Sequence, residues 1–584
     1  MLNMCRMYVG AGMNTLFFGD NLDVMRERIA DASVDLIYLD PPFNSKATYN
    51  IVYKSPVGAE SQRKAFEDTW RWEDGAEAAM DDIRRADVSI FKVLHALQGF
   101  MGQSDVMAYL AMMAVRLLEM KRILRDNGSI YLHCDPTASH YLKIVLDAIF
   151  GKEAFTNEII WQRTNSKSHA FTRFSSAHDV ILMYRKSGQF IWQAQYVPHS
   201  DKLLKSHYNN VEDSTGRRYT LGDCLNPNPD RPNLTYEWNG LVKVWRWTKE
   251  KMQSLHDEGR LVYTSSGMPR YKRYLDEMSG TPLTDVWTDI PPINSQAQER
   301  LGYPTQKPVA LLERLIRAST KEGDVVLDPF CGCGTTIHAA ERLGRSWIGI
   351  DVTYLAIQVI VDRIKTRLPS AQYSIEGIPK DEFAARKLAE QDPYVFQEWA
   401  VARVGGQPRG RGPDKGIDGE VIFVRGPNNY GRAIVSVKAG RHVGPDAVRV
   451  LKSVVERERA DMGVFICLND PTQDMRTEAA VGGRIELPGG DRAKIQIVTV
   501  ADLIRGPNLG ILTELNSVTV TQAARAVQRK RPAKVRTPEE LRNEPPLPPM
   551  PIKGGKAAKQ QAQLPLDEPL LVAPQAKPRS RKRS

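Results

Sequence analysis

Two stretches of the chain alternate short apolar segments with longer segments of helical periodicity. In the first, residues 13–150, the apolar positions from Ala108 to Leu124 recur at helical spacing, and the pair Asn127-Gly128 predicts the end of that helix. The predicted strands of this stretch are Thr15–Phe18, Val34–Leu39 and Ser129–His133. Strands that alternate with helices predict a parallel sheet with crossover helices.

The same alternation returns in residues 301–370, after an irregular stretch at 151–300 that is rich in Trp, Tyr, Asn and Pro. One α/β sheet can be assembled from residues 13–150 and 301–370 together. Its second set of predicted elements is a helix at Val309–Thr320, a strand at Val325–Leu327, a helix at Thr336–Leu343 and a strand at Trp347–Ile350. Residues 390–505 form a further α/β stretch, with predicted strands at Gly419–Val424, Ala433–Val437, Gly463–Cys467 and Ile495–Val498.

The 584 residues are 42% apolar and 26% charged, which excludes a collagen, a coiled coil and a wholly disordered chain. Six cysteines are too few for a disulfide scaffold, and neither a membrane span nor a secretory signal is recognisable. A reduced, cytoplasmic protein without a membrane partner is therefore expected. Of the net charge of +11, residues 521–584 carry most, with 15 Lys and Arg against 5 Asp and Glu. We expect this Pro-rich tail to be disordered; its charge favours a polyanion, unless it is solvated without a specific partner.

The first candidate site is Asp40-Pro41-Pro42-Phe43, directly after a predicted strand. Open α/β sheets place their ligand crevice at the carboxyl ends of strands. The prolines fix φ and remove two N–H donors, so the loop presents a carboxylate, a free carbonyl and an aromatic face. Asp40 and the Pro41 carbonyl can accept both N–H groups of an exocyclic amine, while Phe43 stacks on a base flipped out of the duplex. The alternative is a rigid loop whose Asp caps a helix.

The second candidate site lies between the strand that ends at Asp328 and the helix that follows it. Gly332 and Gly334 let the backbone approach a ligand closely, and a threonine just after them can cap the helix. About 20 residues further on, Asp351 ends another predicted strand. The turn is not GxGxxG and has no Lys-Ser/Thr pair, which excludes a P-loop. A sulfonium cofactor has no phosphates and needs carboxylates for its cationic end and its ribose, which Asp328 and Asp351 provide.

With both motifs in this order, residues 13–370 resemble the beta group of DNA amino-methyltransferases, which act on adenine N6 or cytosine N4. The resemblance implies a Rossmann-like sheet, S-adenosylmethionine as the cofactor and a target-recognition region at residues 151–300. It implies catalytic roles for Asp40, Pro41, Pro42 and Phe43. It implies cofactor contacts from Asp20, Thr305, Gln306, Lys307, Asp328, Pro329, Phe330, Gly332, Gly334, Thr335 and Asp351.

Two details qualify this resemblance. Cys333 stands where the family usually has Ser, which can remove a polar contact. Cytosine-N4 members more often begin the tetrapeptide with Ser, so Asp40 favours adenine N6. Basic and aromatic side chains of the target-recognition region are candidates for DNA contacts, although each can equally be an ordinary surface or core residue. They are Arg163, Lys167, His169, Arg173, Trp245, Arg246, Trp247, Arg270, Lys272 and Arg273.

The third candidate site is Asp418, before a predicted strand, together with Lys438 at the end of the next strand. Residues 390–505 resemble the Mrr-type restriction endonuclease domain, in which such a pair holds Mg²⁺ and positions a water. Ser436 occupies the slot where the class has an acidic residue or Gln, so Glu398 or Glu420 would have to compensate. An active nuclease, a decayed or DNA-binding relative and an unrelated α/β domain all stay open.

The sequence therefore predicts a site-specific methyltransferase that acts on double-stranded DNA, with adenine N6 as the acceptor. The alternatives are cytosine N4 as the acceptor, a bifunctional restriction–modification enzyme with Mg²⁺-dependent cleavage, and a DNA-binding protein whose sites are relics. A homodimer is a further expectation.

Overall fold

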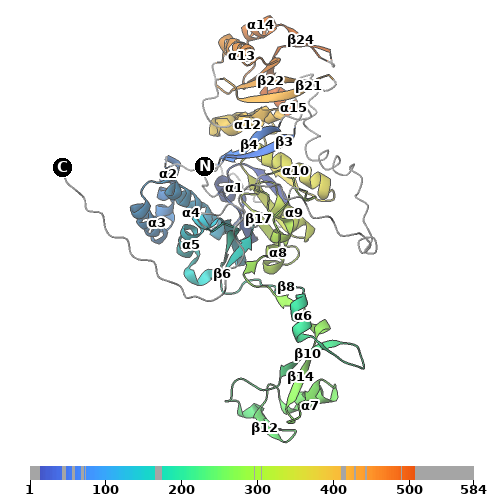
Figure 1. Cartoon of the computed structure of the whole chain (residues 1–584). Coiled ribbons are helices and arrows are strands. Elements are labelled where there is room, and N and C mark those ends of the chain that lie inside the picture. The colour runs from blue at the N-terminus through green and yellow to red at the C-terminus, as the bar shows by residue number, and fades with distance from the viewer. Residues whose placement is uncertain are drawn as a thin grey trace, which may run out of the picture. The chain divides into compact units, whose positions relative to one another are not determined.

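The computed structural model of the chain (Figure 1) describes residues 13–42, 48–54, 60–67, 72, 74–164, 174–294, 296–303, 305–409, 416–426, 429–440, 443–487 and 490–506. Several predictions fall outside these residues: the stacking role of Phe43, the disordered tail at 521–584, and the DNA contacts of Lys167, His169 and Arg173. Within the described ranges, no helix is both long enough and apolar enough to cross a membrane.

Nine strands form the central sheet, in the order β16-β6-β7-β5-β2-β17-β18-β1-β19. They are β1 (Thr15–Phe18), β2 (Val34–Leu39), β5 (Leu124–Cys134), β6 (Phe155–Gln162), β7 (His178–Arg185), β16 (Val286–Trp287), β17 (Val325–Asp328), β18 (Ser346–Asp351) and β19 (Ser374–Glu376). Neighbours from β5 to β19 run parallel, and β7 runs antiparallel to β5 and β6. The parallel part draws on residues 13–150 and 301–370, with β19 just beyond them, in the α/β architecture that the sequence predicts.

Helices cover both faces of this sheet, because its central strands are apolar on both sides (Figure 1). One face packs against α1 (Asn21–Arg28), α2 (Asp74–Ala86), α3 (Val88–Met101), α4 (Asp105–Ile123) and α5 (Pro136–Phe150). The other packs against α8 (Val309–Ser319), α9 (Thr335–Arg342) and α10 (Tyr354–Arg367). Leu36 and Tyr38 of β2 point toward α8–α10, and Asp40 continues this alternation. A separate hairpin pairs β3 (Thr48–Lys54) with β4 (Glu60–Glu67).

Two boundaries differ from the prediction. The helix end predicted at Asn127-Gly128 is wrong, because α4 ends at Ile123 and β5 begins at Leu124. A Cβ atom on Gly128 would lie 2.8 Å from the Asp35 carbonyl oxygen, so this glycine permits close approach of two strands instead of ending a helix. The sheet also continues past residue 150, since β6, β7 and β16 come from the stretch assigned to target recognition.

The remainder of that stretch forms small sheets around its own apolar cluster, in which Trp245 is fully buried. A four-stranded sheet has the order β13-β14-β10-β9, and two further pairs are β11-β12 and β15-β8. The elements are β8 (Tyr196–Val197), α6 (Asp201–His207), β9 (Asn210–Val211), β10 (Arg218–Asp223), β11 (Thr235–Trp238), β12 (Leu241–Val244), α7 (Lys249–Asp257), β13 (Leu261–Tyr263), β14 (Pro269–Tyr274) and β15 (Thr281–Pro282).

The C-terminal domain has a five-stranded sheet in the order β20-β21-β22-β23-β26. Its strands are β20 (Gln407–Pro408), β21 (Gly419–Gly426), β22 (Asn429–Lys438), β23 (Met462–Cys467) and β26 (Ile495–Thr499), and β24 (Arg484–Leu487) pairs with β25 (Gly490–Ala493) beside it. Its helices are α11 (Glu382–Gln391), α12 (Pro393–Arg403), α13 (Pro445–Arg457), α14 (Gln473–Val481) and α15 (Val500–Arg505). This is the further α/β stretch that the sequence predicts at residues 390–505.

Candidate active site

Four carboxylates line the carboxyl edge of the central sheet. Asp40 follows β2, Asp328 ends β17, Asp351 ends β18 and Asp20 follows β1. These strands are consecutive neighbours and run parallel, so their carboxyl ends meet at one edge. The structure thus brings together residues that the sequence places about 300 positions apart.

Among the described residues, a hydrogen bond reaches one of the two Asp40 carboxylate oxygens. Its Oδ2 accepts a hydrogen bond from the Lys307 ammonium, and the two side chains are 15% and 12% exposed. Its Oδ1 is buried and has no hydrogen-bond partner among the described residues. Pro41 is buried and Pro42 is half-buried, consistent with a rigid loop. A buried carboxylate oxygen without a donor is costly unless a ligand supplies one.

The loop after β17 ties Asp328 and Asp351 to the backbone. Asp328 accepts from the Phe330 N–H (3.1 Å) and the Thr336 hydroxyl (2.5 Å). Burial, with smaller contributions from the charges of Asp40 and Asp351, raises the pKa of Asp328 to about 7. Asp351 accepts from the Gly332 N–H (2.9 Å), and burial raises its pKa as well. Burial and the neighbouring negative charges thus favour the protonated form of these carboxyl groups.

The glycines and threonines of this loop shape its backbone. Gly332 and Gly334 have φ values of +49° and +72°, where other residues are strained. A Cβ on Gly334 would lie 2.9 Å from Ile360 Cγ1, so its lack of a side chain serves packing against α10. The expectation that a threonine caps α9 is wrong, because Gly334 is the N-cap residue and no side chain caps this helix. Thr335 contacts the buried Arg363 at 3.2 Å instead.

Asp20 is connected to the loop after β17 through a buried arginine, Arg116, that no sequence pattern singled out. Asp20 caps α1 through the Leu22 N–H (2.8 Å) and accepts from Arg116 Nη2 (2.8 Å). Arg116 Nε also donates to Asn21 (2.6 Å), whose amide donates to the Pro329 carbonyl (2.8 Å). The resemblance implies a role for Asp20 and Pro329; the structure adds the contacts that join their loops.

Residues of the Thr305-Gln306-Lys307 segment make two kinds of contact, one within their own loop and one with Asp40. Both ends of the Gln306 amide bond the adjacent backbone, accepting from the Leu301 N–H (2.8 Å) and donating to the Glu299 carbonyl (2.6 Å). Gln306 therefore closes its own loop, and Thr305 is half-buried within it. Lys307 contacts the loop after β2, where its ammonium donates to Asp40. Pro304 lies outside the described residues.

A row of buried polar side chains, also missed from the sequence, crosses three strands beside Asp40. The Tyr38 hydroxyl lies 2.8 Å from His133 Nδ1, and His133 Nε2 lies 3.2 Å from Asp179 Oδ2. Arg163 Nε lies 3.0 Å from the other oxygen of Asp179. The sequence signal for this row was a histidine and an aspartate at the ends of apolar runs, Ile130–Leu132 and Val180–Met183.

These contacts fit a cofactor with positive charge. Asp328 is buried and Asp351 is half-buried; both have raised pKa values and lie at the same edge as Asp40. A ligand with a sulfonium and an ammonium group would favour the ionised form of these carboxylates. These carboxylates therefore suit S-adenosylmethionine, and Asp328 and Asp351 are the residues that would hold it.

Most candidate DNA contacts of the insert have other partners. Trp245 is buried and donates to the Tyr236 carbonyl, so it is a core residue. Lys272 pairs with Glu212 (2.6 Å), and Arg270 lies 3.6 Å from Asp223. Trp247 packs against Tyr271, with ring centroids 5.2 Å apart. Two candidates, Arg246 and Arg273, have exposed side chains.

In the nuclease-like pair, Asp418 contacts both Lys438 and the backbone of β22. Asp418 is buried, and its Oδ2 accepts from the Val437 N–H (2.6 Å) and from the Ser436 hydroxyl (3.2 Å). Lys438 Nζ lies 3.7 Å from the same oxygen. Glu420 pairs with Arg409 (3.0 Å). Within the described ranges, no group of three or more His, Cys, Asp or Glu side chains could hold a metal ion.

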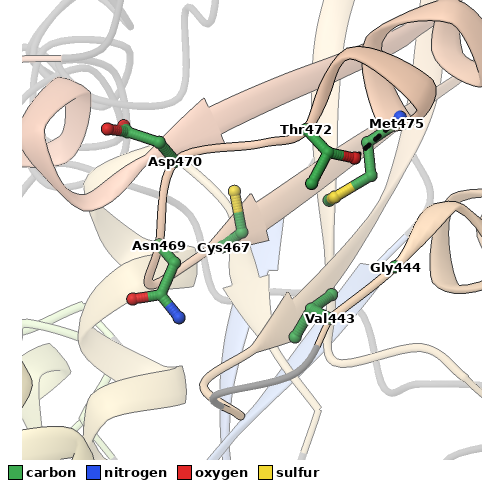
Figure 2. Close-up of a pocket in the computed structure, with 7 residues that line it drawn as sticks. All are labelled: Val443, Gly444, Cys467, Asn469, Asp470, Thr472 and Met475. Atoms are coloured by element: carbon green, nitrogen blue, oxygen red, sulfur yellow. Dashed lines mark hydrogen bonds between the residues drawn. The ribbon is translucent and has the colours of Figure 1, made fainter.

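Beside this pair, at the carboxyl ends of β22 and β23, lies a pocket of about 480 Å³ (Figure 2). Its wall includes Cys467, which is the register partner of Lys438. The Asn469 side chain accepts from Arg386 (2.7 Å). Thr472 accepts from the Met475 N–H (3.3 Å) and caps α14, as Figure 2 shows. These polar groups therefore stabilise the domain itself.

Two family models match the chain. Residues 34–362, more than half of the chain, match the model of DNA methylases. Residues 396–505 match a model described as NACHT-associated inactive Restriction Endonuclease 1.

Curated relatives match over part of their length. The type II methyltransferase M.EcaI of Enterobacter cloacae is 35% identical over 301 residues, which cover 50% of this chain and 66% of that protein. The Mod subunit of the type III restriction-modification enzyme StyLTI of Salmonella typhimurium is 28% identical over 351 residues, 57% of this chain and 50% of that protein. The chain thus spans between half and two thirds of these relatives. A solved DNA modification methylase of Thermus thermophilus, complexed with S-adenosyl-L-methionine, aligns at 18% identity and a TM-score of 0.30 over 62% of this chain and 99% of that one.

Proposed function

Because this chain belongs to the family of DNA methylases, we propose that it transfers a methyl group from S-adenosylmethionine to the N6 amine of an adenine in double-stranded DNA. The alternative acceptor is the N4 amine of cytosine. The observation that carries the proposal is the buried Oδ1 of Asp40, an acceptor for which the described residues supply no donor, at the edge where Asp328 and Asp351 also lie.

The reaction needs an amine whose lone pair is free to attack. In an adenine that lone pair is delocalised into the ring, and hydrogen bonds from both N–H groups draw the nitrogen toward a tetrahedral form. Asp40 Oδ1 would accept one N–H, and the Pro41 carbonyl, in a loop whose prolines lack N–H donors, would accept the other. The base must leave the duplex to reach this edge. The stacking role predicted for Phe43 remains a prediction, since Phe43 is outside the described residues.

S-adenosylmethionine supplies an electrophilic methyl group on a sulfonium. Asp328 and Asp351 would bind its cationic and ribose groups, with the glycine turn at residues 332–334 beside them. Transfer would form a nitrogen–carbon bond at the amine and break the carbon–sulfur bond, with its electron pair left on sulfur. The amine then loses one proton, which Asp40, as the carboxylate that holds the amine, would accept. The site contributes mainly proximity and orientation.

This proposal is tested by methyl transfer to DNA from labelled cofactor. We expect Asp40→Ala to lose transfer while cofactor binding stays within about threefold of the parent, because Asp40 orients the acceptor and not the donor. Glu153→Ala, at an exposed position where the side chain is 89% accessible, is the matched control. Full activity in Asp40→Ala would remove the assignment of Asp40.

We further propose that the C-terminal domain does not cleave DNA. Asp418 has its Oδ2 bonded to the backbone and to Ser436, the residue in the slot where a nuclease has an acidic ligand. Incubation of plasmid with Mg²⁺ or Mn²⁺, with and without prior methylation, tests this. We expect no cutting; cutting that disappears in Asp418→Ala would restore the bifunctional alternative. That the protein works in the cytoplasm, and that it forms a homodimer, both stay predictions. Light scattering on the purified chain tests the homodimer.

A further inference from the structure

Lys307 occupies a central place in the site. It lies just before α8, and its ammonium donates to Asp40 Oδ2. The resemblance implies a cofactor contact for this lysine, and one of its partners here is the carboxylate that would receive the acceptor amine. The contact joins residues 267 positions apart, so it is a product of the tertiary fold.

The charge of the same lysine also acts on a second carboxylate, Asp179. Burial alone would raise the pKa of Asp179, but hydrogen bonding to His133 and the charges of His133, Lys307 and Arg163 hold it below the usual range. Asp179 is nearly inaccessible, with its side chain 3% exposed. A carboxylate kept ionised in such a position balances the charge of a half-buried ammonium such as that of Lys307.

The row of Tyr38, His133 and Asp179 fixes where that second carboxylate lies. The three residues belong to β2, β5 and β7, which are neighbours in the sheet. Their contacts of 2.8 Å and 3.2 Å run across the strands, and the His133 ring also meets Trp161 edge to face at 5.9 Å. Rigid strands therefore hold Asp179, so its negative charge keeps a fixed position in the sheet.

We propose that Lys307 is a positioning residue for methyl transfer, which holds Asp40 Oδ2 so that Oδ1 is left to accept the N–H of the target amine. This inference rests on the proposed function and names a residue that acts through Asp40. A carboxylate can rotate, and without Lys307 either oxygen could turn away from the amine. Misplacement of a reacting group by about 1 Å can cost about 100-fold in rate.

The test compares Lys307→Met and Lys307→Arg in the full chain, with Lys321→Met as an exposed control at the other end of α8. For each variant we would measure cofactor affinity by calorimetry and the single-turnover rate on genomic DNA from a methylation-free host. We expect Lys307→Met to slow transfer about 100-fold at saturating cofactor while its affinity for the cofactor changes less than about threefold. Lys307→Arg should recover part of the rate.

Asp40 provides the second arm. If Lys307 acts through Asp40, adding Lys307→Met to Asp40→Asn should slow transfer little further. Weakened cofactor binding in Lys307→Met, with a normal rate at saturation, would overturn the proposal and make Lys307 a cofactor ligand. Equal losses in both Asp40 backgrounds would also overturn it. Absence of transfer by the parent chain would instead refute the proposed function itself, and is thus distinguishable.

Discussion

Asp328 should make cofactor binding depend on pH across the neutral range. In the folded chain, burial raises the pKa of this carboxyl to about 7. If the cationic cofactor requires the ionised form, about one tenth of the protein is competent at pH 6 and about nine tenths at pH 8. Affinity for S-adenosylmethionine should therefore weaken about tenfold from pH 8 to pH 6, which corresponds to about 1.4 kcal/mol.

Calorimetric titration of the full chain at several pH values measures this slope. Asp328→Asn cannot ionise, so it should bind more weakly at pH 8 and lose most of the slope. Thr336→Val removes the hydroxyl that donates to Asp328 (2.5 Å) and favours its ionised form, so it should move the inflection to higher pH. An identical slope in the parent and in Asp328→Asn would refute the assignment.

The raised pKa of Asp328 also makes the stability of the folded chain depend on pH. The folded pKa of Asp328 lies above its unfolded value, so the folded chain binds more protons between about pH 4 and pH 7. Without cofactor, this carboxyl contributes stability that is present below about pH 4 and is lost as pH rises through about 7. Bound cofactor should offset this loss, and thermal denaturation with and without cofactor measures it.

Three further variants probe other contacts. Asp418→Ala leaves the Val437 N–H buried without its acceptor, so thermal denaturation should show the C-terminal domain destabilised by about 2 kcal/mol, with methyl transfer unchanged; unchanged stability would contradict the structural role. Arg116→Met removes the donor to Asp20 and should weaken cofactor binding by calorimetry together with a loss of about 3 kcal/mol in denaturant unfolding, an outcome absent if the two loops are independent. Trp245→Ala should cost about 3–5 kcal/mol locally and abolish DNA methylation while cofactor affinity persists; loss of cofactor binding too would show that the insert does not fold separately.

The central elements could be predicted because their sequences are unambiguous. The strands that precede Asp40 and Asp351 are largely apolar runs, and both appear in the sheet with their aspartates at the carboxyl edge. Parallel strands necessarily bring such ends together. Ser436 was singled out from the sequence as a weak metal ligand; in the structure its hydroxyl bonds Asp418 at 3.2 Å, and the loss of nuclease activity stays a prediction.

Other features were beyond sequence patterns because they depend on tertiary contacts. The Lys307–Asp40 and Arg116–Asp20 pairs join residues 267 and 96 positions apart, and no local periodicity reports such contacts. Trp245, in a basic and aromatic stretch, resembled a DNA contact but belongs to the core of a small lobe. Short strands carry too few alternating positions to separate these two roles.

The most direct test of the account is the modification pattern of a genome. The chain would be expressed in a host without DNA methylation, and the genomic DNA sequenced by a method that reads N6-methyladenine and N4-methylcytosine. The account predicts N6-methyladenine within one short motif, lost in Asp40→Ala. Modified cytosine would contradict the choice of base, and an unmodified genome, with the protein folded and binding cofactor, would contradict the proposed reaction.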